Sequence, residues 1–352
     1  WEDDQIILQL SAVRHKQGWL LGKLEGLGFR MREEATLETL TQDVIKSSEI
    51  EGENLPADQV RSSIARRLGI EIAGEVTANG NVEGVVEMML DATQRYNELL
   101  TDERLFGWHA SLFPTGRSGM YKIQVGSWRD DAKGPMQVVS GAIGNEKVHY
   151  EAPEAERLDI EMTKFLEWFN KITTMDPVLK AAIAHLWFVT IHPFDDGNGR
   201  IARAIADMQL ARADASRQRF YSMSAQIQRE RNVYYDILEK TQKGNLDITK
   251  WLLWFIECLD RAISLSEENL SGVTQKAKFW ESHQGVALNA RQRKMLNKLM
   301  DGFEGKLTSS KWATIAKCSP DTALRDIQDL IEKGILEKEE SGGRSTSYRV
   351  RG

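Results

Sequence analysis

Apolar residues recur every three or four positions along most of this chain, which is the spacing of helices that bury one face. Near the start, Ile6, Leu10 and Val13 follow this spacing and Gly28 ends it. The pattern predicts helices over residues 4–27, 36–50, 83–112, 158–169, 178–191 and 199–213, with further amphipathic helices to about residue 265. The chain is therefore expected to be mainly α-helical.

The pattern changes between about residues 114 and 153, where glycines separate short runs of β-prone residues. Two of these runs, Met136–Val139 and Lys147–Tyr150, have the length and composition of strands. A small β-hairpin is thus expected inside an otherwise helical region.

Residues 288–352 have a character of their own. The spacing predicts three helices, the third beginning at Ser319-Pro320, followed by two short strands around a Gly342-Gly343 turn. Three helices and a two-stranded wing are typical of a winged helix-turn-helix domain. In a DNA-binding interpretation, the helix over 320–333 enters the major groove and Arg344 reaches the backbone.

The charge of that third helix argues against DNA. It carries four acidic residues, which would repel phosphate: Asp321, Asp326, Asp329 and Glu332. A protein-interaction or dimerisation module is favoured, and DNA binding stays open.

Composition narrows the class of protein. A length of 352 residues predicts two or three domains, and a net charge of −6 disfavours non-specific nucleic-acid binding. No apolar run is long enough to span a bilayer. The two cysteines fall in different predicted domains, which disfavours a disulfide framework. A cytoplasmic protein without membrane contact is expected.

The densest chemistry lies between two apolar helices, in the run from His192 to Arg203. Pro193 stops the first helix, and Phe194 is expected to pack beneath the loop. His192 can accept a proton near neutral pH and so suits a general base. Each residue alone has an ordinary structural explanation, but their combination predicts a loop that handles phosphate.

The remaining residues of the run supply anion and cation ligands. Asp196 could hold Mg²⁺, which prefers one or two carboxylates together with substrate phosphates. Gly197, Asn198 and Gly199 open the next helix, whose free N–H groups favour an anion. Arg200 and Arg203 share a face of that helix, and each guanidinium can bind a phosphate through two N–H groups.

The string His-Pro-Phe-x-Asp-Gly-Asn-Gly-Arg-x-x-Arg resembles the signature of Fic domain proteins at every specified position, and the similarity extends over about residues 85–260. The resemblance implies transfer of AMP from ATP to a Tyr, Thr or Ser hydroxyl of a target protein. His192 would be the catalytic base and Asp196 the Mg²⁺ ligand. Residues 197–199, Arg200 and Arg203 would bind the phosphates.

Two further segments resemble parts of that family. The hairpin over residues 136–153 resembles the flap that aligns a target segment by strand addition, although a purely structural hairpin is an equal alternative. Tyr234 and Tyr235 resemble the region that lies against adenine, and a core role for one of them is equally open.

An upstream segment matches the family's inhibitory motif. Ser47, Glu51 and Gly52 stand at the spacing [Ser/Thr]-x-x-x-Glu-[Gly/Asn], at the end of a helix expected over about 36–52. The resemblance implies that Glu51 pairs with Arg203 where the γ-phosphate of ATP would lie. In some relatives the same glutamate supports the reverse reaction, de-AMPylation.

The sequence therefore predicts an N-terminal helical region (1–84), a Fic-type catalytic core (85–265) and a winged-helix domain (288–352). The expected function is a self-inhibited protein adenylyltransferase with ATP as co-substrate and Mg²⁺ as cofactor. Self-modification and homo-oligomerisation are open. The alternatives are a Fic enzyme that transfers another phosphate-containing group, and a DNA-binding regulator whose Fic core senses a nucleotide.

Overall fold

The computed structural model describes residues 1–72, 74–132, 134–141, 147–300, 303, 305–339 and 346–351, without the side chains of residues 269–278. The chain forms two compact units, residues 1–267 and 268–352. None of the described helices combines the length and the apolar character needed to cross a bilayer.

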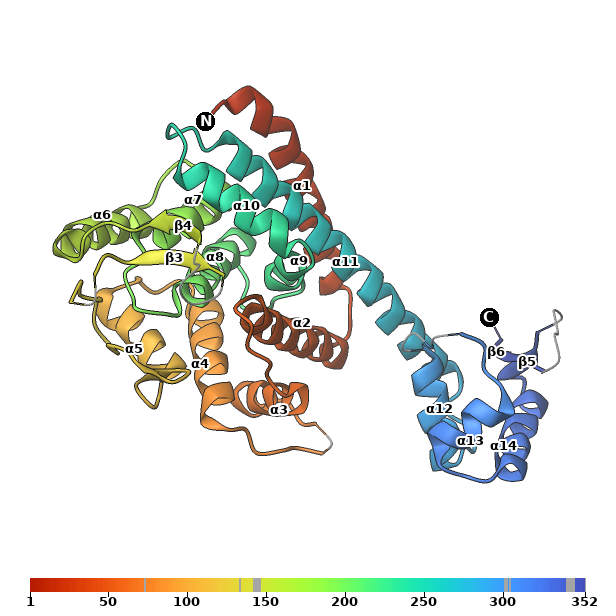
Figure 1. Ribbon diagram of the computed structural model, residues 1–352. Helices are drawn as coiled ribbons and strands as arrows, with labels where there is room; N and C mark the ends of the chain where they lie inside the picture. Colours follow the sequence, from red (N-terminus) through yellow and green to blue (C-terminus); the bar gives the residue numbers. More distant parts are fainter. Residues whose placement is uncertain are drawn as a thin grey trace. The chain divides into compact units, whose positions relative to one another are not determined.

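The first unit is built almost entirely from helices (Figure 1). Its elements are α1 (Asp3–Glu25), α2 (Phe29–Ile50), α3 (Ala57–Leu68), α4 (Gly80–Gln94), α5 (Asp102–Leu112), β1 (Arg117–Ser118), β2 (Tyr121–Lys122), β3 (Gln137–Ser140), β4 (Lys147–Glu151), the 3₁₀ turn η1 (Ala155–Arg157), α6 (Leu158–Asn170), α7 (Pro177–Ile191), α8 (Asn198–Asp214), α9 (Met223–Arg229) and α10 (Arg231–Gln242). Helix α11 (Thr249–Ser282) begins in this unit and continues past residue 267 into the second.

Helices α7 and α8 form the centre of this unit. Both are buried on nearly every side, and they pack against each other. Helices α1, α2, α4 and α5 also pack against α8, and α6 packs against α7. The loop that joins α7 to α8 is therefore held by the most buried part of the fold.

Residues 1–84 and 85–265, which the sequence treats as separate regions, fold into this one unit. Helix α2 lies against α3 and α9, and α3 lies against α4, so the upstream helices share the core of the downstream ones. Burial of Leu37, Leu40 and Val44 on α2 contributes to that shared core.

Several predicted boundaries were wrong. Helix α2 begins at Phe29 rather than near 36, because its first turns are charged and exposed and carry no apolar spacing. The region predicted to be helical over 83–112 contains two helices, since Thr101 caps a new one at Asp102. Helix α3 was not predicted, and α11 extends to Ser282 rather than to about 265.

The two predicted strand runs are confirmed as β3 and β4. They pair antiparallel, with Val138 opposite Tyr150 and a bulge between Val138 and Val139. Strands β1 and β2 form a second, shorter antiparallel pair.

The second unit contains α12 (Ala290–Met300), α13 (Ser309–Ala316), α14 (Pro320–Glu332), β5 (Leu336–Lys338) and β6 (Tyr348–Val350). The predicted order of three helices and an antiparallel strand pair is confirmed. Arg344 and the Gly342-Gly343 turn lie outside the described residues. The winged-helix assignment stays a prediction.

Two of the four acidic residues of α14 have hydrogen-bond partners inside the second unit. Asp326 accepts hydrogen bonds from Asn289 and Arg291, and Asp329 accepts from Gln292 and Lys333. These two carboxylates are therefore paired within the unit, and the unfavourable charge expected on an outer face of α14 is smaller than the sequence suggests.

Candidate active site

The site is built on the loop between α7 and α8. Helix α7 ends at Ile191; the next residue, His192, has a left-handed backbone (φ 51°, ψ 58°), and Pro193 prevents continuation. Gly197, with φ +83°, makes the turn into α8, which begins at Asn198. A non-glycine residue with positive φ is sparsely populated, so the surroundings must hold His192 in place.

His192 has the tautomer and charge state of a base. Its Nδ1–H donates to the carbonyl of Val189 at 3.2 Å, which leaves the lone pair of the neutral ring on Nε2. Burial lowers the pKa of His192, so the neutral form predominates at neutral pH. Such an imidazole can accept the proton of a hydroxyl.

The loop is braced from within. Phe194 is fully buried and stacks on His109 with ring centroids 4.2 Å apart, as expected for its packing role. His109 accepts a hydrogen bond from the Gly126 N–H on Nδ1, and its Nε2–H donates to the carbonyl of Asp196 at 3.2 Å. Burial lowers the pKa of His109 to about 4, so it acts as a neutral spacer.

Asn198, predicted to bind nucleotide, has its side chain engaged inside the loop. Its amide accepts from the Phe194 N–H at 3.0 Å and donates to the Phe194 carbonyl at 2.8 Å. At 2% exposure the side chain closes the turn. Its backbone N–H, in the first turn of α8, is the part left for an anion.

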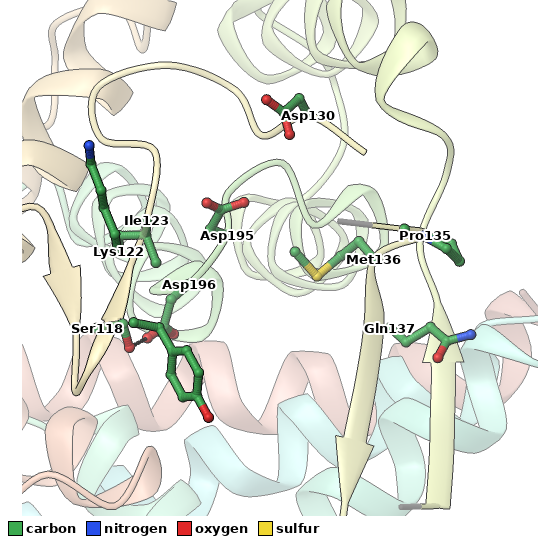
Figure 2. Close-up of a pocket in the computed structure, with 11 residues that line it drawn as sticks. Ser118, Lys122, Ile123, Asp130, Pro135, Met136, Gln137, Asp195 and Asp196 are labelled. Atoms are coloured by element: carbon green, nitrogen blue, oxygen red, sulfur yellow. Dashed lines mark hydrogen bonds between the residues drawn. The ribbon is translucent and has the colours of Figure 1, made fainter. Parts of the chain in front are cut away.

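Asp196 lies at the edge of a cavity of about 420 Å³. Its carboxylate accepts from the Gly197 N–H at 2.6 Å and from the Ser118 hydroxyl (Figure 2). The flap contributes Met136 and Gln137 to the opposite wall. The other lining residues are Tyr121, Lys122, Ile123, Asp130, Gly134, Pro135 and Asp195.

The donor set suits a cation that arrives with phosphate. Among the described residues, no group of three His, Cys, Asp or Glu side chains could hold a metal by itself. Mg²⁺ commonly binds through one or two carboxylates and completes its shell with phosphate oxygens and water. Asp196 beside an open cavity fits that mode.

The predicted pairing of Glu51 with Arg203 is confirmed. Arg203, whose side chain is 1% exposed, lies 2.8 Å from Glu51 Oε1. It also donates to the hydroxyl of Ser47 at 2.9 Å and to its carbonyl at 2.8 Å. Burial acts to lower the pKa of Arg203, but the Glu51 carboxylate, together with Tyr234 and Tyr235, more than compensates and raises it.

The close approach of Glu51 depends on Gly199. A Cβ atom at that position would lie 2.1 Å from Glu51 Oε1, so any other residue would displace the carboxylate. Gly52, with φ +85°, turns the chain after α2 and directs the next residues back toward α8.

Glu53 is a contact that the sequence did not predict. Its carboxylate lies 2.7 Å from Nη1 of Arg200, whose side chain is 3% exposed. Both arginines of the motif therefore already hold a carboxylate from the segment after α2. The only signal in the sequence was an acidic residue directly after the inhibitory motif.

The two tyrosines divide between core and site. Tyr234 is 1% exposed and its hydroxyl hydrogen-bonds to Nε2 of His185 at 2.9 Å, which is the core role left open above. Tyr235 is partly exposed, and its hydroxyl lies 3.4 Å from Glu51 Oε2. Of the pair, Tyr235 is the one beside the inhibitory segment.

Comparison with known protein families gives two matches. Residues 99–210 match the Fic/DOC family, and residues 1–70 match a domain of unknown function called DUF4172. The second match contains the segment that carries Ser47 and Glu51.

The chain is similar to proteins named protein adenylyltransferase Fic. It is 27% identical to that of Culex quinquefasciatus over 241 residues, covering 66% of this chain and 42% of the relative. It is 34% identical to that of Drosophila erecta over 110 residues, covering 31% and 21%. The chain thus spans less than half the length of these relatives.

Solved structures share the fold. A Fic family protein from Desulfovibrio desulfuricans G20 superposes with a TM-score of 0.55 at 20% identity, covering 98% of this chain and 96% of that one. Fic-1 (residues 134–508) from C. elegans gives 0.52 at 20% identity, covering 76% and 73%. With the loop geometry and the family match in agreement, residues 99–210 of this chain are a Fic/DOC family domain.

Proposed function

We propose that this protein transfers AMP from ATP to the hydroxyl of a Tyr, Thr or Ser residue on a target protein. The observation that supports it best is the placing of a neutral histidine and two buried arginines around the start of α8. The similarity to proteins named protein adenylyltransferase Fic agrees with this reaction.

In the proposed step, Nε2 of His192 removes the proton of the target hydroxyl. The oxygen attacks the α-phosphorus in line, an oxygen–phosphorus bond forms, and the bond to the bridging oxygen breaks to release pyrophosphate. The N–H groups of residues 197–199 stabilise the charge that develops on the phosphate. Arg200 and Arg203 bind the β- and γ-phosphates.

Asp196 would hold Mg²⁺, which would neutralise charge on the α- and β-phosphates. The hydroxyl of Ser118 and the N–H of Gly197 orient its carboxylate toward the cavity. The flap borders the same cavity through Met136 and Gln137, and its β3–β4 pair offers an edge on which an extended target segment could add as a strand.

The resting state is proposed to be inhibited. Glu51 and Glu53 occupy the guanidinium groups that the β- and γ-phosphates would need. A nucleotide then has to displace two carboxylates, or bind with its phosphates in an unproductive position. Reverse de-AMPylation assisted by Glu51 belongs to the same proposal.

The test is intact-mass spectrometry of purified Glu51→Gly protein after incubation with ATP and Mg²⁺. The variant should gain the mass of AMP faster than the wild type, because Arg203 is released. Glu51→Gly/His192→Ala should gain none while still being stabilised by ATP. Glu38→Gly, on the exposed side of the same helix, is the matched control and should behave as the wild type.

The mass that is gained separates the alternatives. Addition of UMP or phosphate from other donors would assign a different transfer to the same site. An ATP-stabilised Glu51→Gly protein that modifies neither itself nor a mixture of candidate proteins would overturn the proposal.

A further inference from the structure

One buried arginine outside the signature motif binds both the catalytic loop and the flap. Arg129 follows β2, and its side chain has no exposed surface. Its Nε–H donates to the carbonyl of His192 at 2.9 Å, and its Nη2–H donates to the carbonyl of Pro153 at 2.5 Å. Its backbone N–H donates to the carbonyl of Pro193 at 2.9 Å.

Asp131 completes the arrangement. Its Oδ1 binds Nη1 of Arg129 at 2.8 Å, and its Oδ2 accepts from the N–H of Ala155 at 2.6 Å. Pro153 and Ala155 lie in the segment that leads from the flap strand β4 into η1. The pair Arg129–Asp131 therefore makes four side-chain contacts, one to the catalytic loop, two to the base of the flap and one within the pair.

We propose that Arg129 is a positioning residue that fixes the flap and the catalytic base of this adenylyl transfer at one separation. Arg129 holds the left-handed backbone of His192 by a hydrogen bond to the His192 carbonyl. It holds the base of the flap by a hydrogen bond to the Pro153 carbonyl. The inference rests on the proposed function, in which the flap presents the hydroxyl and His192 receives its proton.

The guanidinium also acts on His192 electrostatically. The charged groups around the His192 ring are Arg129, which lowers its pKa, and Glu51 and Asp196, which raise it. Removal of the Arg129 charge should therefore shift the proton equilibrium of His192 to higher pH. A residue that only stabilised the fold would leave that equilibrium in place.

Arg104 is a matched comparison. Its side chain is 11% exposed, binds Asp91, and donates to the carbonyls of Asp91, Arg95, Glu98 and Leu99. None of these groups belongs to the catalytic loop or the flap. Replacement of either arginine by methionine should lower the stability of the fold. Only the replacement of Arg129 should also alter the transfer step.

The experiment compares Arg129→Met, Arg129→Lys, Asp131→Asn and Arg104→Met in the Glu51→Gly protein, using self-modification by labelled ATP. Arg129→Met should reduce the rate at saturating ATP by about tenfold or more while changing the half-saturating ATP concentration less than about twofold. Arg129→Lys, which keeps the charge, should recover part of that rate. Asp131→Asn should fall between Arg129→Met and the parent.

NMR titration of the His192 ring, assigned with His192→Gln, gives a readout that needs no activity. The proton-binding constant should rise about threefold or more in Arg129→Met and stay near the parent value in Arg129→Lys and Arg104→Met. An unchanged constant and an unchanged rate in Arg129→Met would overturn the inference. If Arg129→Met does not fold, Arg129→Lys and Asp131→Asn decide it, because parental rates in both would reject the positioning role.

A failure of the proposed adenylyl transfer would give a different result from a failure of the proposed role of Arg129. A Glu51→Gly protein with native Arg129 that transfers nothing would count against adenylyl transfer, whereas the His192 titration would still report on Arg129.

Discussion

Glu53 and Glu51 are two residues apart, yet each binds a different arginine of α8. Release of Arg203 alone leaves Arg200 paired at 2.7 Å with Glu53. The two contacts should therefore inhibit separately, with Glu53 the weaker because its side chain is 47% exposed, compared with 31% for Glu51.

We predict that Glu51→Gly/Glu53→Gln modifies itself faster than Glu51→Gly, by about twofold to tenfold, with a lower half-saturating ATP concentration. Glu53→Gln alone should have a small effect, because Arg203 stays blocked. The measurement is a double-mutant cycle on the initial rate, with Glu38→Gln as control. Equal rates for the double variant and Glu51→Gly would show that Glu53 only contacts Arg200.

The residues of the motif could be predicted because they act within twelve positions of one another. A single turn at Gly197 suffices to bring His192, Asp196 and Arg200 together. Glu53 lies 147 positions from Arg200, and Arg129 lies 63 from His192. These two contacts form only when the fold brings distant segments together, so no local pattern in the sequence predicts them.

At the scale of elements, α2 leads into the segment proposed to be inhibitory and is anchored by a buried carboxylate. Asp43 accepts from the hydroxyl of Ser222 and, at 3.3 Å, from the Ser224 N–H, while its Oδ2 has no partner in the described structure. Asp207 and Arg219 are the charged groups that face it, and burial raises its pKa to about 8. The protonated form is therefore the one that α2 accommodates.

The free energy of unfolding should depend on whether the Asp43 carboxyl is protonated. The pKa of Asp43 is higher in the folded protein than in the unfolded chain, so its contribution is fully present below about pH 4. It is lost as pH rises through about 8. We predict that the stability of Asp43→Asn relative to the wild type rises by on the order of 4 kcal/mol between pH 5 and 8.5, because the wild type loses about 1.4 kcal/mol per pH unit until the pKa of Asp43 is reached.

Urea unfolding at several pH values measures this difference. Asp58→Asn, on α3, changes an exposed carboxylate and should leave the pH profile parallel to that of the wild type. Parallel profiles for Asp43→Asn as well would mean that Asp43 is ionised in the folded protein throughout this range.

Elements were predictable where burial follows apolar residues. The apolar residues of α7 are visible in the sequence, and so are the β-prone runs that form β3 and β4. Helix α3 was not predicted, because its buried face includes the polar residues Ser62 and Ser63. The helical region over 83–112 was predicted without its division into α4 and α5, because apolar periodicity is present on both sides of the cap at Thr101.

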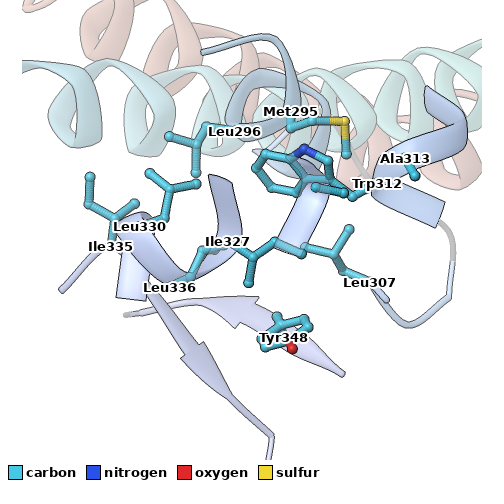
Figure 3. Packing of buried hydrophobic residues seen from close by; sticks show 11 residues of the cluster. Met295, Leu296, Leu307, Trp312, Ala313, Ile327, Leu330, Ile335, Leu336 and Tyr348 are labelled. Atoms are coloured by element: carbon cyan, nitrogen blue, oxygen red, sulfur yellow. The ribbon is translucent and has the colours of Figure 1, made fainter. Parts of the chain in front are cut away.

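At the scale of the whole molecule, the second unit has a core separate from the active site. Trp312 is fully buried and lies in a cluster with Met295, Leu307 and Ile327 (Figure 3). Every site residue considered above belongs to the first unit. Loss of the second unit's packing should therefore leave nucleotide binding intact.

We predict that Trp312→Ala destabilises the second unit by about 3–5 kcal/mol, because it removes a large buried side chain. The ATP-dependent rise in melting temperature of the first unit should persist. Calorimetry with and without ATP checks both, and Trp19→Ala, at a position 51% exposed in the first unit, is the control. Loss of the ATP response in Trp312→Ala would show that the two units depend on each other.

The carboxylates of Glu51 and Glu53 and the arginines they bind belong to one folded unit of one chain. Their encounter is unimolecular, so under the proposed inhibition dilution or overexpression of the protein would leave the proportion of blocked molecules unchanged. A competing polyanion would shift that proportion through its own abundance. The resting activity of such a protein would then follow the supply of nucleotide in its surroundings rather than the number of copies present.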